Sequence, residues 1–299
     1  MILKRLISCY ASDVKKISPK ELKNSIRASE GRVLMGETIV TSPSLVPGIT
    51  NSEMLASFGC DLILLNELDF LQPQVRDLPE AQKPIEYIKK ITGRPVGANL
   101  EPIDETANVV GEKDRISKGR QVNQETLKKL EKSDLDFVLL TGNPETGVSN
   151  EGILKAIKDV KLHFKGLVFA GKMHSSGVQE KMIDFEKIKA FVEAGADGIL
   201  LPCYETVPGI QENELNTAVE KIKALGALTI GAIGTTQEDA TPQDIQNIAL
   251  ANKPIGFDIF HIGDGGPGRI APPENIMTLG ISVRGKRHTY FKMAQSPLR

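Results

Sequence analysis

Polar side chains recur in the sequence directly after short apolar runs, at positions where a buried strand would end. Several of these residues stand two apart in the chain. On an extended strand, residues two apart point to the same side, so each pair could present two functional groups to one site. The pairs are Asn99 and Glu101, Thr141 and Asn143, and Lys172 and His174.

Lys172 and two of the histidines have side chains that suit catalysis. A lysine at the end of a buried strand could act as a fixed cation beside an enolate or a phosphate, or form a Schiff base if its pKa is depressed. An ion-paired, structural lysine is the alternative. His174 and His261 suit general acid–base work or metal ligation, and a structural bond to a backbone carbonyl is their alternative. We predict catalytic roles for Lys172, His174, Glu101 and His261.

Carboxylates at the same kind of position could hold a metal ion. A hard cation such as Mg²⁺ is bound by one or two carboxylates together with oxygens of the substrate. Glu101, beside Asn99, is the first candidate ligand, and Glu37 is the second. The sequence has no HExxH or comparable compact metal motif. Mg²⁺ is therefore the only cofactor predicted, and no organic cofactor is expected.

Two glycine-containing stretches near the C-terminus are typical of anion-binding loops. Gly234-Thr235-Thr236 follows one apolar run, and HIGDGGPG (261–268) follows the next and precedes a helix-like segment. Free backbone N–H groups at such places bind phosphate, sulfate or carboxylate groups. The predicted phosphate-binding residues are Gly234, Thr235, Thr236, Gly263, Asp264, Gly265 and Gly266, and Asn99 and Asn143 are expected to contact the substrate.

The elements that position these residues alternate between strand-like and helix-like segments. Short continuous apolar runs are typical of parallel strands buried on both faces. The strand-like runs are 32–37, 61–66, 95–101, 136–141, 167–172, 197–202, 227–233 and 257–262. The helix-like segments are 51–58, 83–91, 123–133, 150–164, 184–194, 212–225, 242–251 and 273–294. This order predicts the α/β class and a (βα)₈ barrel, or TIM barrel, over residues 32–299.

Residues 1–31 precede the first strand and are predicted to form an N-terminal helical extension. Ser18-Pro19-Lys20-Glu21 reads as a capping box with proline at the first helical position, and Gly31 follows the helix. We expect this helix to cover the N-terminal opening of the barrel, where it would have a role in stability.

An internal echo supports the count of eight strands. The even-numbered runs each have an aspartate at or next to their first residue, namely Asp61, Asp136, Asp197 and Asp258. The odd-numbered runs carry glycine pairs, namely Gly31/Gly36, Gly93/Gly97, Gly166/Gly171 and Gly226/Gly231. Alternate strands fill the same interior layer of such a barrel. The second glycines could point inward and leave room for a ligand, or outward and let helices pack closely.

The long polar segment 102–122 follows the third run. A loop of this length in a compact domain is usually functional or mobile. Lys113, Arg115, Lys118 and Arg120 could fold over an anionic ligand as a lid. The alternative is a solvated loop.

The composition of the chain limits which binding partners and which cellular location we expect. Lysine plus arginine number 37 and aspartate plus glutamate 38, so no net charge draws the chain to nucleic acid or to a membrane surface. The three cysteines are far apart, and no apolar stretch is long enough for a membrane span. These observations predict a cytoplasmic protein that binds neither nucleic acid nor membrane. The basic cluster near the end of the last helix could be a solvated face or a contact in a homo-oligomer.

Several stretches resemble an uncharacterised bacterial family of phosphate-binding barrels. They are NLEP (99–102), LTGNPETGVSNE (140–151), AGKMHSSGV (170–178), VPGI (207–210), AIGTTQE (232–238), HIGDGGPG (261–268) and ENIMTLGISVRGKRHTY (274–290). Members of that family have carried the labels phosphoenolpyruvate phosphonomutase-like and haloacid dehalogenase-like. The sequence lacks the KxCGH-type loop of the phosphonomutase and isocitrate lyase group and the DxDxT motif of the dehalogenases.

Together, the residues and the resemblance predict an enzyme for a small phosphorylated metabolite, either a sugar phosphate or a phospho-carboxylate. The expected chemistry is of the lyase or isomerase type, with a proton abstracted beside a carbonyl to give an enolate. His174 or Glu101 would move the proton, and Lys172 would stabilise the enolate. Two alternatives are a Schiff-base aldolase that uses Lys172 and a non-catalytic, ligand-sensing barrel.

Overall fold

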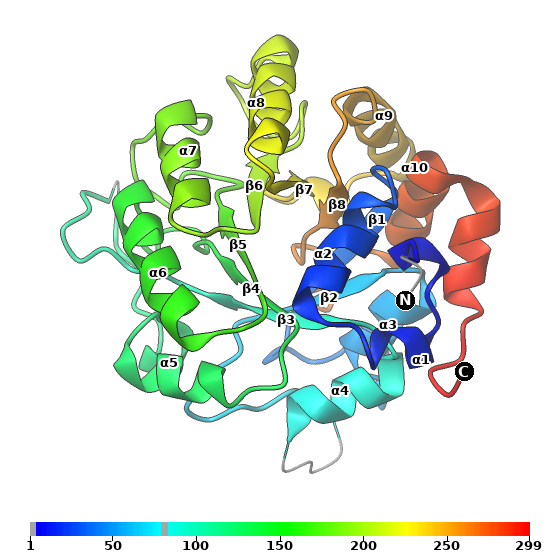
Figure 1. Ribbon diagram of the computed structural model, residues 1–299. Coiled ribbons are helices and arrows are strands. Elements are labelled where there is room, and N and C mark those ends of the chain that lie inside the picture. Colours follow the sequence, from blue (N-terminus) through cyan, green and yellow to red (C-terminus); the bar gives the residue numbers. More distant parts are fainter. Residues whose placement is uncertain (1–3, 79–82, 110) are drawn as a thin grey trace.

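A computed structural model describes residues 4–78, 83–109 and 111–299, and it shows a closed barrel of eight parallel strands surrounded by helices (Figure 1). Each strand pairs with its neighbours in chain order, and β8 pairs with β1. The strands are β1 Val33–Ile39, β2 Leu62–Asn66, β3 Val96–Leu100, β4 Phe137–Leu140, β5 Leu167–Gly171, β6 Gly198–Pro202, β7 Leu228–Ile233 and β8 Ile259–Ile262. The predicted (βα)₈ barrel is confirmed.

Helices follow the strands around the outside of the barrel (Figure 1). They are α3 Asn51–Ser57, α4 Pro84–Thr92, α5 Gln124–Glu131, α6 Asn150–His163, α7 Phe185–Glu193, α8 Glu212–Ala224, α9 Pro242–Asn252 and α10 Pro273–Met293. Short 3₁₀ turns are η1 Leu6–Ser8, η2 Lys118–Arg120 and η3 Gln237–Asp239. Among the described residues, no helix combines the length and the apolar character needed to cross a membrane.

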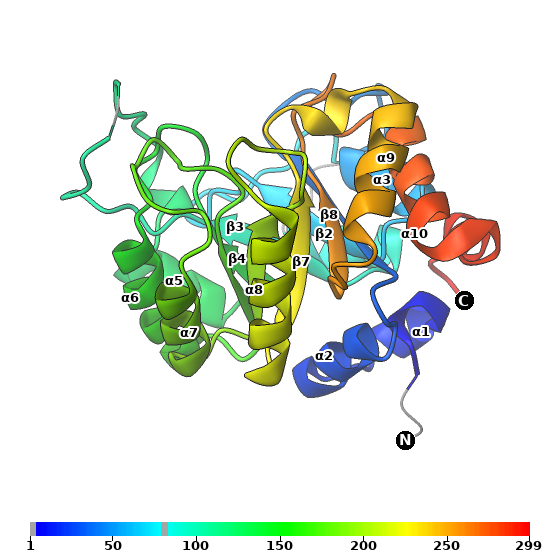
Figure 2. The same ribbon diagram turned by 90° about the horizontal axis from the view of Figure 1, so that it is seen from above.

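The N-terminal extension consists of η1, α1 (Ala11–Val14) and α2 (Pro19–Arg27), and residues 1–3 lie outside the described residues. The predicted capping box is present, because Ser18 accepts the Glu21 N–H and Glu21 accepts the Ser18 N–H. Helix α2 lies across one end of the barrel (Figures 1 and 2). Lys23 binds Asp197 at the start of β6, and Arg27 binds the carbonyl of Gly226 before β7. The extension therefore covers the N-terminal opening, as the sequence predicts.

The repeated aspartates at the entries of the even strands have a structural role. Each carboxylate accepts a backbone N–H from near the start of the preceding odd strand, at 2.8–3.1 Å. Each one also forms an ion pair with a lysine or arginine of a neighbouring element. The aspartates are Asp61, Asp136, Asp197 and Asp258. The repeat in the sequence thus reflects four equivalent contacts between neighbouring strands, at the N-terminal end of the barrel.

Side chains fill the lower part of the barrel interior. The rings of Phe137 and Phe169 lie 5.4 Å apart between their centroids inside the barrel. Gly97 faces the Phe137 ring, whereas Gly36 and Gly231 face the outer layer, where Leu55 and Cys203 pack. One of these glycines thus points inward and two point outward, so each of the two alternatives holds for some of them. The inward glycine accommodates an aromatic ring, so a ligand has room only above this layer.

Gly97→Ala is expected to lower the free energy of unfolding by about 1–3 kcal/mol through overpacking. A Cβ atom at Gly97 would lie 2.3 Å from two ring carbons of Phe137. Urea denaturation of the wild type and of Gly97→Ala measures the loss. In a Phe137→Leu background the same change should cost less, because the ring is gone. An equal cost in both backgrounds would show that Phe137 is not the cause.

The long segment after β3 extends outward near α5 and α6 (Figure 2). It pairs with the loops after β4 and β5, through Ile103 with Val148 and Val109 with Val178. Lys113 bonds within the segment, to the carbonyl of Asp104 and to Glu105. At the end of the segment, Arg120 reaches Glu101 at the end of β3. Of the four cations predicted to form a lid, Arg120 is the one with an ion pair at the rim among the described residues.

Candidate functional site

The C-terminal ends of the strands carry a buried polar rim. Strand alternation explains its direction, because Met35 and Leu64 point into the barrel core and the residues two positions later point the same way. Glu37 of β1, Asn66 of β2, Asn99 of β3 and His261 of β8 are all at most 5% exposed. Buried polar groups persist in this way when they are held by hydrogen bonds or built for a ligand.

Glu37 lies at the centre of the first cluster. Its Oε2 atom is 2.8 Å from Nε2 of His261, and its Oε1 atom accepts a hydrogen bond of 2.5 Å from the Asn99 amide. A carboxylate only accepts, so this contact assigns the ring proton of His261 to Nε2. Nδ1 of His261 and Oδ1 of Asn99 are buried and have no partner among the described residues. Buried polar atoms without a partner are uncommon in proteins, and they mark this cluster as a place where a ligand group could supply the missing hydrogen bonds.

Glu101 lies at the centre of the second cluster. It forms an ion pair of 2.8 Å with Arg120 and accepts two hydrogen bonds from Asn143, one from the backbone N–H and one from the side chain. Asn143 in turn bonds Asn66, and Asn66 donates to Asp264 at 2.8 Å. This chain of contacts joins the ends of β2, β3, β4 and β8. Because its carboxylate is already held by Arg120, Glu101 is better suited to fixing Asn143 than to moving a proton.

His174 lies in the loop after β5 and is half-buried. Its Nδ1 atom accepts a hydrogen bond of 3.0 Å from the Ser176 backbone N–H. Burial lowers the pKa of His174 to about 4; nearby Glu37 opposes this shift and nearby Lys172 reinforces it. The ring is therefore neutral at pH 7, with its proton on Nε2. Such a histidine can donate a hydrogen bond to a developing oxyanion.

Lys172 contacts Glu180, although it also lies close enough to His174 to help lower the pKa of that ring. Gly171, which precedes Lys172, has φ +148°, and a Cβ atom there would meet the backbone of Leu200 in β6, so strand alternation does not fix the direction of Lys172. Its Nζ atom forms a 2.5 Å ion pair with Glu180, which also accepts the Asn150 N–H at the start of α6. The catalytic role expected of Lys172 stays a prediction; in the structure its Nζ atom is bound by Glu180 beside the start of α6.

The loops after β7 and β8 meet, as the sequence predicts, but a protein carboxylate lies between them. Glu238 of η3 is buried, and its Oε1 atom accepts the Gly265 N–H at 2.7 Å. The Gly263 N–H donates to Ile233, and the hydroxyls of Thr235 and Thr236 bond backbone carbonyls. One of the N–H groups expected to receive a phosphate, that of Gly265, thus already binds Glu238. The loops therefore do form an anion-binding place, but the carboxylate of Glu238 binds there.

Comparisons with known proteins place this chain in a family. A family model described as "Domain of unknown function (DUF7916)" matches residues 7–299. The chain belongs to this family. None of the curated proteins matches the DUF7916 sequence significantly. Neither the haloacid dehalogenase-like label nor a bacterial origin, both implied by the resemblance in the sequence, finds support in these comparisons.

Solved structures that resemble this chain include two enzymes. One is the crystal structure of 2,3-dimethylmalate lyase, a PEP mutase/isocitrate lyase superfamily member, with a TM-score of 0.48, 13% identity, and coverage of 85% of this chain and 81% of that one. The other is oxaloacetate acetylhydrolase in complex with oxalate, with a TM-score of 0.48, 15% identity, and coverage of 83% and 80%. Likeness at this level carries no argument about function.

The metal prediction gains no geometric support in the DUF7916 barrel. Among residues 4–78, 83–109 and 111–299, no group of three or more histidine, cysteine, aspartate or glutamate side chains is arranged to hold a metal ion. Both candidate ligands, Glu101 and Glu37, already accept hydrogen bonds from protein side chains on their carboxylates. Mg²⁺ therefore stays a prediction, and the ion would have to compete with these partners.

Three residues of the DUF7916 rim have roles that sequence reasoning missed. Arg120 was expected in a lid and instead pairs with Glu101, and Glu238 was not singled out although it stands two residues after Thr236. Asn66 ends β2 and links Asn143 to Asp264. Only Asn66 had a usable signal, because it is a polar residue at the end of an apolar run.

Asp264 provides a prediction about pH. Burial raises the pKa of Asp264 well above its usual value, the charge of Glu37 adds to this, and the Asn66 hydrogen bond opposes it. A raised pKa in the folded state means that its stability contribution is full at acidic pH and is lost as the pH rises through that value. Asp264→Asn imitates the protonated form. We expect its Tm to exceed that of the wild type at pH 8 and the difference to shrink at pH 5. A lower Tm at both pH values would contradict the burial argument.

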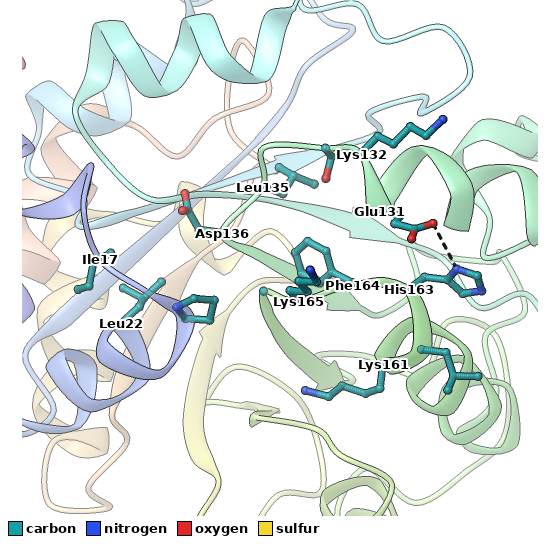
Figure 3. A pocket seen from close by; sticks show the side chains of 14 residues that line it. Ile17, Leu22, Glu131, Lys132, Leu135, Asp136, Lys161, His163, Phe164 and Lys165 are labelled. Atoms are coloured by element: carbon teal, nitrogen blue, oxygen red, sulfur yellow. Dashed lines mark ion pairs between the residues drawn. The ribbon is translucent and has the colours of Figure 1, made fainter.

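A cavity of about 780 Å³ lies at the opposite end of the DUF7916 barrel, between α2 and the loops that precede β4 and β5 (Figure 3). His163 and Glu131 form an ion pair 3.8 Å long at its edge. The side chains of Lys132 and Lys161 point in opposite directions (Figure 3). Because these charged groups do not converge, we do not place the functional site there.

Proposed function

We propose that this chain is a TIM-barrel enzyme of the lyase or isomerase type that moves a proton beside a carbonyl group of a small metabolite. The Glu37–His261 pair at the C-terminal end of the barrel is the observation that carries the proposal. Active sites of such barrels are built at this end, from residues at the ends of several strands. Here the groups come from β1, β3, β8 and the loop after β5.

The proton-moving group is the imidazole of His261, supported by Glu37. With its ring proton held on Nε2 by the carboxylate, His261 presents the bare Nδ1 atom as a base. Removal of a proton from the substrate carbon leaves an enolate and turns the ring into an imidazolium. The Glu37 carboxylate, buried and 2.8 Å away, balances that new charge.

His174 is the proposed donor to the enolate oxygen. Its neutral ring carries the proton on Nε2, because Nδ1 accepts the Ser176 N–H. A neutral imidazole in a buried place is a fixed dipole that favours negative charge on a carbonyl oxygen. The sequence-based roles are thereby redistributed: Glu101 positions Asn143, and Lys172 acts at a distance, through its ion pair with Glu180.

The sequence and the structure point to different substrate classes. The sequence predicts a phosphorylated substrate bound by the loops after β7 and β8. Glu238 occupies the Gly265 N–H there, and the carboxyl groups of Asp264 and Glu37 lie nearby. A phosphate would therefore have to displace Glu238. We propose that the substrate's polar group at this place is uncharged, such as a hydroxyl, and that a phosphate, if present, lies elsewhere on the molecule.

Paired thermal-shift measurements separate these substrate classes. A ligand at a hundred times its Kd adds about 2.7 kcal/mol of stability, which is measurable as a higher Tm. Each sugar phosphate is compared with its free sugar, and each phospho-carboxylate with its hydroxy acid. Stabilisation by the unphosphorylated member of a pair supports our proposal. Stabilisation by the phosphorylated member that Glu238→Gln enhances would show that phosphate uses the seat beside Gly265.

Solvent deuterium exchange tests the reaction. The protein is incubated in D₂O with a panel of carbonyl compounds, with and without Mg²⁺, and loss of the carbon-bound proton signal is followed by NMR. Exchange beside the carbonyl of at least one compound is expected. No exchange with any compound, including those that raise the Tm, would contradict proton transfer. The crowding of Glu37, Asn99 and His261 speaks against the alternative of a non-catalytic sensor.

The Schiff-base alternative rests on Lys172. Burial lowers its pKa, which favours an imine-forming amine, and the ion pair with Glu180 opposes that shift. Borohydride trapping with a substrate, read by mass spectrometry, distinguishes the two mechanisms. Our proposal predicts no mass increase on Lys172. A covalent adduct there would favour the aldolase.

A further inference from the structure

A second cavity, of about 720 Å³, lies at the N-terminal end of the barrel, where α2 meets the starts of β1, β7 and β8. Its lining is rich in cations and contains few acids. The cations are Arg27, Arg32, Lys223, Lys253 and Arg284, and the acids are Glu30 and Asp258. The cavity is remote from the polar rim, because most of its lining residues precede β1, β7 or β8, and Arg284 of α10 pairs with Asp61 at the start of β2.

Protein carboxylates neutralise three of these cations. Arg32 pairs with Glu30 at 2.6 Å, and Lys223 pairs with Asp258 at 3.4 Å. Arg284 is buried and pairs with Asp61, which lies outside the cavity.

Arg27 and Lys253 are in a different situation. Arg27 donates to the Gly226 carbonyl at 2.9 Å, and Lys253 donates to the Ser282 carbonyl at 3.4 Å. Within the part of the chain that the structure describes, neither forms an ion pair with a carboxylate. Both residues are exposed and line the same cavity, so two positive charges there lack a carboxylate partner among the described residues.

The field beside the cavity is positive as well. The pKa of His288 in α10 is lowered first by burial and then by four arginines, Arg5, Arg32, Arg287 and Arg284. A histidine surrounded by cations reports a surface that favours anions. Ala227, Phe257 and Val283 supply an apolar part of the lining against which an organic group can rest.

We propose that this cavity binds a small phosphorylated metabolite, with its phosphate bound by Arg27 and Lys253, which both line it. An arginine fork binds two phosphate oxygens, and a lysine adds a compact point charge. A phosphate dianion matches the two uncompensated cations. The site is separate from the proton-transfer rim, so it would stand even if the proposed reaction were wrong. It also gives a phosphate a place on this molecule that the acidic rim does not offer.

Isothermal titration with inorganic pyrophosphate at low ionic strength tests the site in the full chain. The test variant is R27Q/K253Q. The matched control is K132Q/K165Q, which removes two exposed lysines from the other cavity at the same end of the barrel. We expect one pyrophosphate per chain for the wild type and binding about tenfold weaker for R27Q/K253Q, with the control changed by less than about twofold.

Three results would overturn the proposal. The first is no pyrophosphate binding by the wild type at millimolar concentration. The second is equal weakening in the test and control variants, which would show a diffuse charge effect. The third is a loss of binding in Arg120→Gln while R27Q/K253Q binds normally, which would locate the anion at the polar rim. All of the substituted residues except Arg120 and Arg27 are lysines on the exposed surface, and unchanged thermal melts exclude unfolding as the cause.

Discussion

Glu37→Gln is expected to lower the rate of substrate proton exchange by a factor of about 10² to 10⁴, the usual contribution of a positioned acid–base group. Glu37 accepts two N–H groups, from His261 and from Asn99. Glutamine has one acceptor oxygen and places a donor where the second oxygen was. One of the two N–H groups must then face another donor, so the ring of His261 is no longer held with Nδ1 bare. The amide also cannot balance the imidazolium charge.

Glu205→Gln is the matched control for this substitution. Glu205 follows β6 at the same end of the barrel, and it is exposed. Its replacement should leave the exchange rate unchanged. Circular dichroism and thermal melts show whether both variants are folded. A Glu37→Gln protein that exchanges at the wild-type rate would mean that the pair does not move the proton.

Asp61→Asn is expected to lower the free energy of unfolding by about 3–5 kcal/mol, because it leaves a buried cation uncompensated. Asp61 is fully buried and pairs with Arg284 at 2.5 Å and with Lys292 at 3.4 Å. It also accepts the Leu34 N–H at the start of β1. Arg94, likewise buried, lies close by and binds the carbonyls of Cys60 and Lys292. Urea denaturation followed by circular dichroism measures the loss.

Lys292→Met is the informative comparison in the same cluster. Burial lowers the pKa of Lys292 to about 8, opposed by Asp61 and reinforced by Arg94. Its removal leaves Asp61 paired with Arg284, and the Cys9 carbonyl keeps its bond from Gln295. We expect a cost of no more than about 1 kcal/mol. A cost similar to that of Asp61→Asn would show that size, and not charge balance, governs this cluster.

The barrel could be predicted from the sequence because each of its signals is local. Apolar runs mark the strands, and caps such as Ser18 and Thr241 mark the starts of helices. The aspartate contacts at the starts of the even-numbered strands were also visible in the sequence, as repeated aspartates. A kink inside α10 at Gly285, where φ is +76°, was the kind of detail that helical periodicity does not reveal.

The candidate site was only partly predictable, for two physical reasons. The contact of Lys172 with Glu180 joins the end of β5 to the loop that follows it, and no local pattern in the sequence reveals that contact. The contact between Glu238 and the Gly265 N–H joins residues 27 apart and depends on how two loops meet. The sequence predicted the positions of both loops. It could not show that Glu238 binds the Gly265 N–H there. Glu37 was found as a metal candidate, and only its contact with His261 suggests a base.

The protonation of the His261 ring tests the central claim most directly, because it needs no substrate. The chain has four histidines, so ¹⁵N-detected NMR of the wild type can be assigned with single variants of the other three. Our account predicts, at neutral pH, a proton on Nε2 and a bare Nδ1 in His261, and a change of that signal in Glu37→Gln. A proton on Nδ1 with Nε2 bare, or a spectrum that Glu37→Gln leaves unchanged, would contradict it.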